Sequence, residues 1–92
     1  MEYSVKKSRI EMYRVIDNFM RKFLSGFKSR LASISSSQIY RKLHQKSKIS
    51  AYLINQYLRN LEEICDNKNR RWKVIGREYR RNGTRITLKK ID

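Results

Sequence analysis

The side chains able to do chemistry in this chain are mostly cations and amides. The 92 residues include 23 lysines and arginines, but a single histidine and a single cysteine. His44 and Cys65 are too few to form a metal-ligand cluster, and one cysteine excludes an internal disulfide. The sequence also lacks a Ser/His/Asp constellation and a glycine-rich phosphate loop. We therefore expect a protein that is not an enzyme, with no cofactor and no metal.

The charge balance favours a polyanionic partner. Only eight acidic residues oppose the cations, and the formal net charge is +15. Binding a polyanion relieves the resulting self-repulsion, so nucleic acid is the first candidate partner and an anionic membrane surface the second. No small-molecule ligand is indicated. No stretch reaches the roughly 18 consecutive apolar residues of a membrane span, and residues 1–7 lack the apolar run of a signal peptide. We expect an intracellular protein, in the cytoplasm or a host-cell cytoplasm.

Two helices are predicted in the middle of the chain. Any of the last three serines in the run 33–37 can begin a short helix, because serine hydroxyls accept hydrogen bonds from free backbone N–H groups. This helix carries Ile39 and Leu43 on its apolar side. Ser50 is a second N-cap, and apolar residues spaced by three and four after it predict a helix from Ala51 to about Cys65.

A longer amphipathic helix is predicted before them. Apolar residues recur at helical spacing from Ile10 to Leu31, with cations between them. Ser25-Gly26 lies inside this stripe and would kink or divide the helix. The stripe exceeds what two small helices can cover, so we expect part of it to form a homodimer interface, through Met12, Tyr13, Ile16, Phe19, Met20 and Phe23.

The C-terminal third changes to the alternation of β-strands. Residues 72–74 and 85–89 alternate between apolar and polar side chains. Asn82-Gly83 between them supplies the positive φ values of a tight hairpin turn. Gly76 interrupts the alternation and predicts a β-bulge. Trp72 is expected in the core, facing the helices.

The order of these elements resembles the winged helix-turn-helix transcription regulators of prokaryotes and archaea, including those of archaeal viruses. The resemblance covers residues 35–88 and rests on the serine-capped short helix, the pattern from Ile54 to Glu62 and the hairpin from Trp72 to Leu88. The connection after Leu43 is longer than in a tight helix-turn-helix, which favours the winged type. The resemblance implies a mainly α fold with a small antiparallel β-hairpin (α+β), three helices and a two-stranded wing. It also implies that Ile34 forms a one-residue strand against the wing.

We accordingly expect one domain over residues 1–92. The long N-terminal helix lies within 1–32, the helix-turn-helix within 35–66 and the wing within 70–91. By the resemblance, the third helix enters the major groove of double-stranded DNA, where amides can bond adenine and arginine can bond guanine. Its candidate contacts are Ser50, Ala51, Tyr52, Asn55, Gln56 and Arg59. The alternative is an ordinary solvated face.

Two further groups of candidates would hold the DNA backbone. Cations at the tip and base of the wing are expected on phosphates or in the minor groove, unless their charge only blocks strand addition. They are Lys68, Arg70, Arg71, Arg80, Arg81 and Arg85. The start of the second helix can offer backbone amides to a phosphate, with Ser36, Ser37, Tyr40, Arg41 and Lys42 nearby.

These expectations combine into a sequence-specific, homodimeric DNA-binding regulator, with two reading helices about 34–36 Å apart. The alternative is a non-specific architectural DNA- or RNA-binding protein driven by charge. Membrane-surface binding through the basic first helix stays open as a weaker alternative. Cys65 is expected to be a small buried residue, and His44 a surface turn residue.

Overall fold

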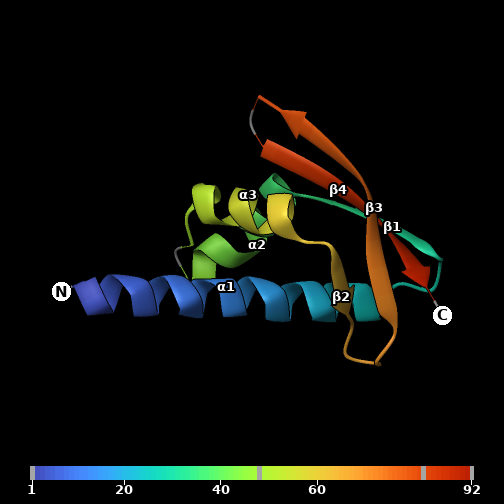
Figure 1. Ribbon diagram of the computed structural model, residues 1–92, viewed down its shortest axis with the longest axis horizontal. Helices are drawn as coiled ribbons and strands as arrows, with labels where there is room; N and C mark the ends of the chain where they lie inside the picture. The colour runs from blue at the N-terminus through green and yellow to red at the C-terminus, as the bar shows by residue number, and fades with distance from the viewer. Residues whose placement is uncertain (1, 48, 82, 92) are drawn as a thin grey trace.

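Three helices and a four-stranded sheet make up this α+β protein. The computed structural model describes residues 2–47, 49–81 and 83–91. The elements in chain order are α1 (Glu2–Ser25), β1 (Leu31–Ser35), α2 (Ser36–Ser47), α3 (Ala51–Asn60), β2 (Glu63–Cys65), β3 (Arg71–Arg80) and β4 (Gly83–Ile91). In Figure 1, α1 lies along one side, α2 and α3 lie over it, and the sheet stands near the C-terminal end of α1.

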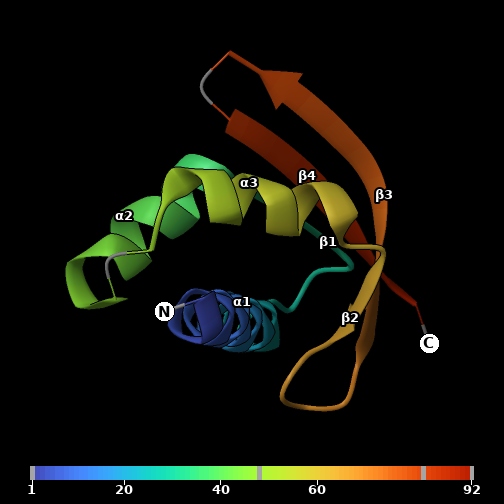
Figure 2. The ribbon, with the colours of Figure 1, turned by 60° about the vertical axis from the view of Figure 1, so that its left-hand side comes forward.

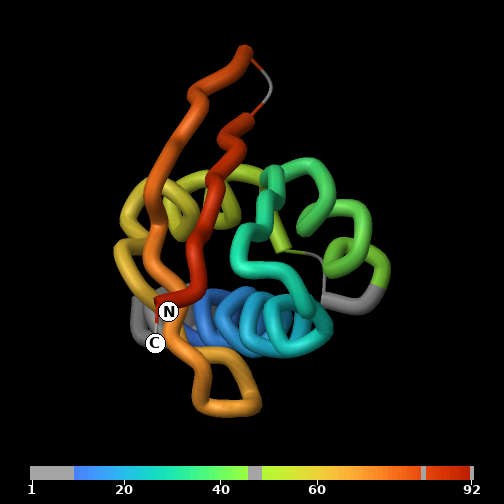
Figure 3. The backbone as a smooth tube through the Cα atoms, turned by 90° about the vertical axis from the view of Figure 1, so that its right-hand side faces the viewer, coloured from blue at the N-terminus to red at the C-terminus, as the bar shows by residue number. Residues whose placement is uncertain are grey.

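The sheet has four strands, so the expectation of a two-stranded sheet is wrong. All its strands are antiparallel, in the order β1-β4-β3-β2. Ile34 belongs to a five-residue strand and pairs with Ile86. Because β1 reaches only Arg85, the end of the hairpin has two strands, and Figure 3 shows it projecting past the helices. Asn82, predicted in the turn, lies outside the described residues.

α1 ends at Ser25, so the predicted continuation to Leu31 is wrong. The Ser25 hydroxyl donates to the carbonyl of Arg21 at 2.7 Å, and the N–H of Gly26 donates to the carbonyl of Phe23 at 3.2 Å. These bonds close the last turn at the Ser-Gly pair. Phe27 then leaves the helix and packs edge-on against Trp72, with ring centroids 6.4 Å apart, and Leu31 begins β1.

α3 begins as predicted and ends earlier. The Ser50 side chain caps it, accepting a hydrogen bond from the N–H of Leu53 at 3.2 Å. The last helical residue is Asn60, so the predicted extension to Cys65 is wrong. Ile64 is buried in β2, where it pairs with Trp72. A long-range strand contact therefore replaces the last helical turn that the apolar spacing suggested.

The core lies where α1, the two shorter helices and one face of the sheet meet. Trp72 is fully buried there, as predicted, and its Nε1–H donates to Asp66 at 3.0 Å. Arg70 also donates to Asp66, at 2.9 Å, and to the carbonyl of Ser25 at 3.0 Å. The Arg70 guanidinium, held by the buried Asp66 carboxylate, thus joins the β2–β3 turn to the end of α1. The remaining fully buried apolar side chains are Ile16, Met20, Leu24, Ile34, Ile39, Ile49, Ile54, Leu58, Ile86 and Leu88.

β3 contains the predicted β-bulge, which decides which residues of the β3–β4 hairpin face the helices. One extra residue, Ile75, stands between Val74 and Gly76 in the pairing with β4. Before the bulge, even-numbered side chains such as Val74 face the helices. After it, Arg77 and Tyr79 do, because they lie opposite buried residues of β4.

Candidate nucleic-acid interface

The tip of the hairpin is attached to the first residue of α2. The Ser36 hydroxyl is buried and accepts a hydrogen bond from the N–H of Thr84 at 3.0 Å. Gly83 makes this approach possible, since a Cβ on it would collide with the Ser36 hydroxyl, and its φ is +155°. Ser36, expected as a DNA contact, is therefore occupied in positioning the hairpin.

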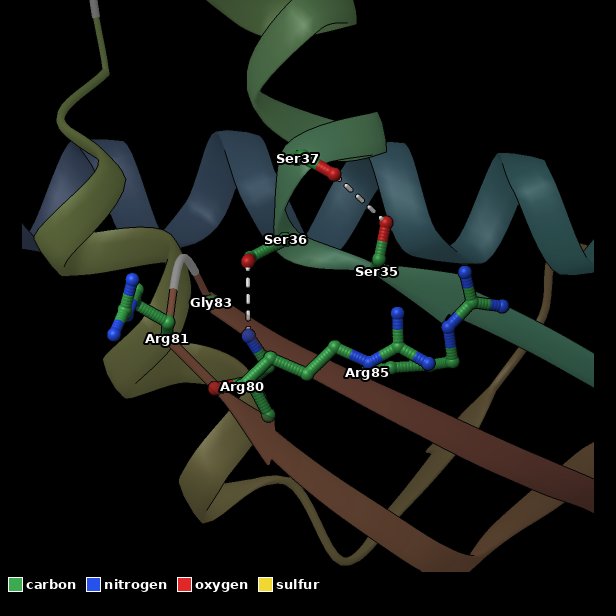
Figure 4. Close-up of a pocket in the computed structure, with 8 residues that line it drawn as sticks. Ser35, Ser36, Ser37, Arg80, Arg81, Gly83 and Arg85 are labelled. Carbon is green, nitrogen blue, oxygen red and sulfur yellow. Dashed lines mark hydrogen bonds between the residues drawn. The ribbon is translucent and has the colours of Figure 1, made fainter.

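One hollow lies between the start of α2 and the hairpin. Figure 4 shows the Ser35 and Ser37 hydroxyls facing each other across 3.1 Å, with hairpin arginines around them. The start of a helix carries partial positive charge and free N–H groups, so arginines beside it favour an anion. The hollow has a volume of about 350 Å³ and is lined by Ser35, Ser36, Ser37, Arg80, Arg81, Gly83, Thr84 and Arg85.

Two polar atoms lining this hollow have unused hydrogen-bonding capacity. The Nε of Arg85 and the Oγ1 of Thr84 are buried and have no partner among the described residues. Among the described residues, the Arg85 side chain makes one long contact, from Nη1 to the Ser33 hydroxyl at 3.4 Å. Buried polar groups in folded proteins are usually paired, so Arg85 keeps hydrogen-bonding capacity beside the hollow.

A second hollow lies on the other side of the tip, against α3. Its volume is about 390 Å³. Tyr52 is prominent on its helical side, with 66% of its surface exposed. Asn55 donates to the carbonyl of Ala51 at 3.0 Å, and its Oδ1 has no partner among the described residues. The lining residues are Tyr52, Asn55, Gln56, Arg59, Arg80, Arg81 and Gly83.

The two hollows meet at the hairpin tip. Arg80, Arg81 and Gly83 line both of them. In Figure 4, Arg81 and Arg85 lie on opposite sides of Gly83. The candidate residues of α3, of the start of α2 and of the wing tip therefore form one continuous polar surface, as Figure 2 helps to place: the tip rises beside α3.

Other predicted contacts lie elsewhere. Tyr40 stacks on His44, with ring centroids 4.6 Å apart. His44 is exposed, as expected, but it belongs to helix α2, so the expected turn position is wrong. Arg41 and Lys42 are exposed on the same helix, outside both hollows. Ala51 is exposed at the start of α3, next to the capping Ser50.

The cations at the base of the wing are separate from those at its tip. Figure 3 shows the β2–β3 turn at the opposite end of β3 from the hairpin tip. There Arg70 is bound to Asp66, and Arg71 pairs with Glu63 at 3.2 Å. Lys68 is exposed on this turn. The structure thus divides one predicted group into two, and gives Arg70 a structural role.

The expected dimer residues also divide into two groups. Ile16 and Met20 are fully buried in the core of one chain, so their assignment to an interface is wrong. Met12, Tyr13, Phe19 and Phe23 are partly buried against that core. Ile10, nearer the N-terminus of α1, is 59% exposed. Cys65 is a free, half-buried thiol.

Sequence reasoning missed several residues of this surface. Ser35 and Thr84 line the first hollow. Tyr79 reaches α3 from the wing, and its ring lies 5.2 Å from the guanidinium carbon of Arg59. The position of Tyr79 follows from the bulge at Ile75, after which odd-numbered side chains of β3 face the helices.

Comparisons with protein-family models, with curated proteins and with solved structures find no match to this chain. Over residues 2–47, 49–81 and 83–91, none of the helices is long and apolar enough to cross a membrane. Within the same residues, no group of three or more His, Cys, Asp or Glu side chains could hold a metal ion.

Proposed function

We propose that this protein is a winged helix-turn-helix protein that binds double-stranded DNA in a sequence-specific manner. The observation that carries the proposal is the meeting of the two hollows at Arg80 and Arg81. One hollow offers amides and an arginine from a helix, the chemistry that reads base edges in the major groove. The other offers a helix start and arginines, the chemistry that holds a phosphate.

The order of elements supports the same proposal. Helix, strand, two helices and a final hairpin follow one another, and β1 pairs with the last strand. The short β2 is an addition at the far edge of the sheet. In this arrangement α3 enters the major groove while the wing tip rests on the adjoining backbone or minor groove. The net charge of +15 supplies the attraction to any duplex.

A homodimeric transcription regulator is the form of this function that we propose. Apolar side chains lie along both edges of the buried stripe of α1: Ile10 and Tyr13 on one edge, and Met12, Phe19 and Phe23 on the other. These edges are the surfaces offered to a second copy. Such a dimer would read a pseudo-palindromic site.

The decisive experiment is selection of bound duplexes from a random DNA pool by the whole chain, at about 200 mM salt to weaken phosphate-only binding. We expect enrichment of one defined sequence. Duplex RNA serves as competitor. A specific-to-random affinity ratio near one would overturn sequence-specific binding and favour the non-specific DNA- or RNA-binding alternative.

A matched pair of variants tests the hollow against α3. Gln56→Ala is expected to change the selected sequence, because Gln56 lines the hollow against α3 and does not line the hollow beside α2. Arg41→Ala, on the exposed face of α2, is expected to leave the selected sequence unchanged. If both variants select the wild-type sequence, α3 is not the reading surface.

A further inference from the structure

The contact between Arg59 and Tyr79 joins the reading helix to the wing. Arg59 is in the last turn of α3, and its guanidinium carbon lies over the Tyr79 ring, 5.2 Å from the centroid. Tyr79 is 63% exposed, so the core does not account for an aromatic residue at this place. The only aromatic–cation contact of Tyr79 among the described residues is this one.

The fold holds the two partners at a fixed separation. Arg77, two residues before Tyr79 on the same face of β3, donates to the carbonyls of Leu58 and Leu61 at the end of α3. Its guanidinium therefore ties the strand to the helix end on either side of Arg59. The bulge at Ile75 turns both Arg77 and Tyr79 toward the helix.

From this arrangement we infer that Tyr79 is a positioning residue, which holds the Arg59 guanidinium ready to read a guanine. The inference rests on the proposed function and adds to it the base that this position selects.

The chemistry of the guanidinium supports this role. A guanidinium stacked through its face keeps its N–H groups in the plane free, and those groups bond O6 and N7 of guanine in bidentate fashion. An unrestrained arginine loses much side-chain entropy when it is fixed on a base. An arginine already held by an aromatic ring loses less, so the stack raises affinity for the one base that this arginine fits.

Neighbouring side chains leave Arg59 open to the DNA. It is exposed and lines the hollow that also contains Gln56 and Asn55. Among the described residues, the ion pairs near the hairpin tip involve other groups, such as Arg80 with Glu78 at 3.1 Å. The contact with Tyr79 therefore orders the guanidinium without drawing its charge into one of these ion pairs.

The test compares Tyr79→Phe, Tyr79→Ala and Arg59→Ala on the selected duplex and on duplexes changed at each base pair. We expect Arg59→Ala to lose the preference for guanine at one position. Tyr79→Ala should weaken that same preference about two- to fivefold, the range of an exposed cation–π contact, and Tyr79→Phe should retain it. The double variant should match Arg59→Ala. Leu31→Ala, which changes an exposed apolar residue of β1 outside both hollows, is the control and should behave as wild type.

A second readout needs no DNA. In the free protein, the Arg59 side-chain protons should show an aromatic ring-current shift in NMR spectra that Tyr79→Phe keeps and Tyr79→Ala removes. If Tyr79→Ala weakens binding to all duplexes equally, or leaves the guanine preference intact, the inference is overturned while the proposed function stands. If the wild-type protein prefers no base at any position, the proposed function fails, and the inference with it.

Discussion

The N–H of Thr84 donates to the Ser36 hydroxyl at 3.0 Å, across 48 positions of the chain. Both residues are buried, at 2% and 4% exposure. This single bond joins the hairpin tip to the first residue of α2, between the two hollows. The bond therefore fixes the position of the hairpin tip, at which the proposed phosphate-binding and base-reading surfaces meet.

Ser36→Ala is expected to lower the free energy of unfolding by about 1–3 kcal/mol, since it leaves the buried Thr84 N–H without a partner. Chemical denaturation measures the loss, and amide hydrogen exchange at Thr84 should become faster. Ser37→Ala is the matched control, because the Ser37 hydroxyl is exposed and contacts only Ser35 among the described residues. Equal effects of the two substitutions would contradict this role for Ser36.

Gly83→Ala is expected to destabilise the protein by about 1–3 kcal/mol, because the new methyl group would meet the Ser36 hydroxyl at a backbone conformation that favours glycine. Gly76→Ala provides the comparison. A Cβ there would lie 3.9 Å from the Cβ of Thr87, an ordinary contact. Thermal unfolding of both variants should show a clear loss for Gly83→Ala alone; a loss confined to Gly76→Ala would refute the assignment.

Acid should weaken the fold through Asp66. Burial alone would raise the pKa of this carboxyl, but hydrogen bonds from the backbone N–H of Arg70, from Trp72, from the N–H of Lys68 and from the Arg70 guanidinium lower the pKa to about 2. The unfolded carboxyl titrates near pH 3.9. The contribution is therefore complete above about pH 4 and is lost as the pH falls toward 2.

Asp66→Asn should lower the melting temperature at pH 7, since the charged acceptor of these bonds is removed. It should also flatten the dependence of the melting temperature on pH between 4 and 2. Calorimetry or circular dichroism at several pH values provides the measurement. Parallel pH profiles for the variant and the wild type would show that another group governs the acid sensitivity.

Arg81→Ala should weaken binding to every duplex by a similar factor and leave sequence preference unchanged, because a phosphate contact carries no base information. Each phosphate contact removed should reduce the slope of log affinity against log salt by about one. Arg71→Ala is the control at the other end of β3, where Glu63 pairs with the arginine. If Arg71→Ala changed the slope of log affinity against log salt more than Arg81→Ala, the phosphate contact would lie at the base of the hairpin and not at its tip.

The proposed dimer predicts twice the chain mass in light scattering at high salt, across a dilution series. Ile10→Glu should return the mass to that of one chain without loss of helix content, because Ile10 is largely exposed in the single chain. A single-chain mass for the unmodified protein at every concentration would refute the dimer.

Local signals in the sequence predicted the start of α3 better than its end. Ser50 and the bulge at Gly76 were readable because each rests on chemistry within a few residues. The end of α3 was not, since Ile64 fits helical spacing as well as a strand. Only its pairing with Trp72, a contact distant in sequence, decides between them.

The candidate site followed the same division. Gln56 and Arg59 could be found from helical spacing, and Arg80 and Arg81 from their place beside the turn. The separation of Arg70 from this group could not, because it requires knowing that Asp66 lies buried beneath it. The position of Tyr79 is predictable from the sequence, because the change of alternation at Gly76 turns the odd-numbered residues after it toward the helices.

The wing is held at both ends: by the Asp66 network at its base and by Ser36 near its tip. Because it is attached at both ends, the hairpin has little freedom to move toward or away from α3. The angle between the two proposed DNA-contacting elements is then a property of the protein before any duplex arrives. If the duplex does not match this angle, the DNA has to deform, and the free energy of that deformation depends on its sequence. Flexible and rigid duplexes with identical contacted bases should therefore differ in affinity.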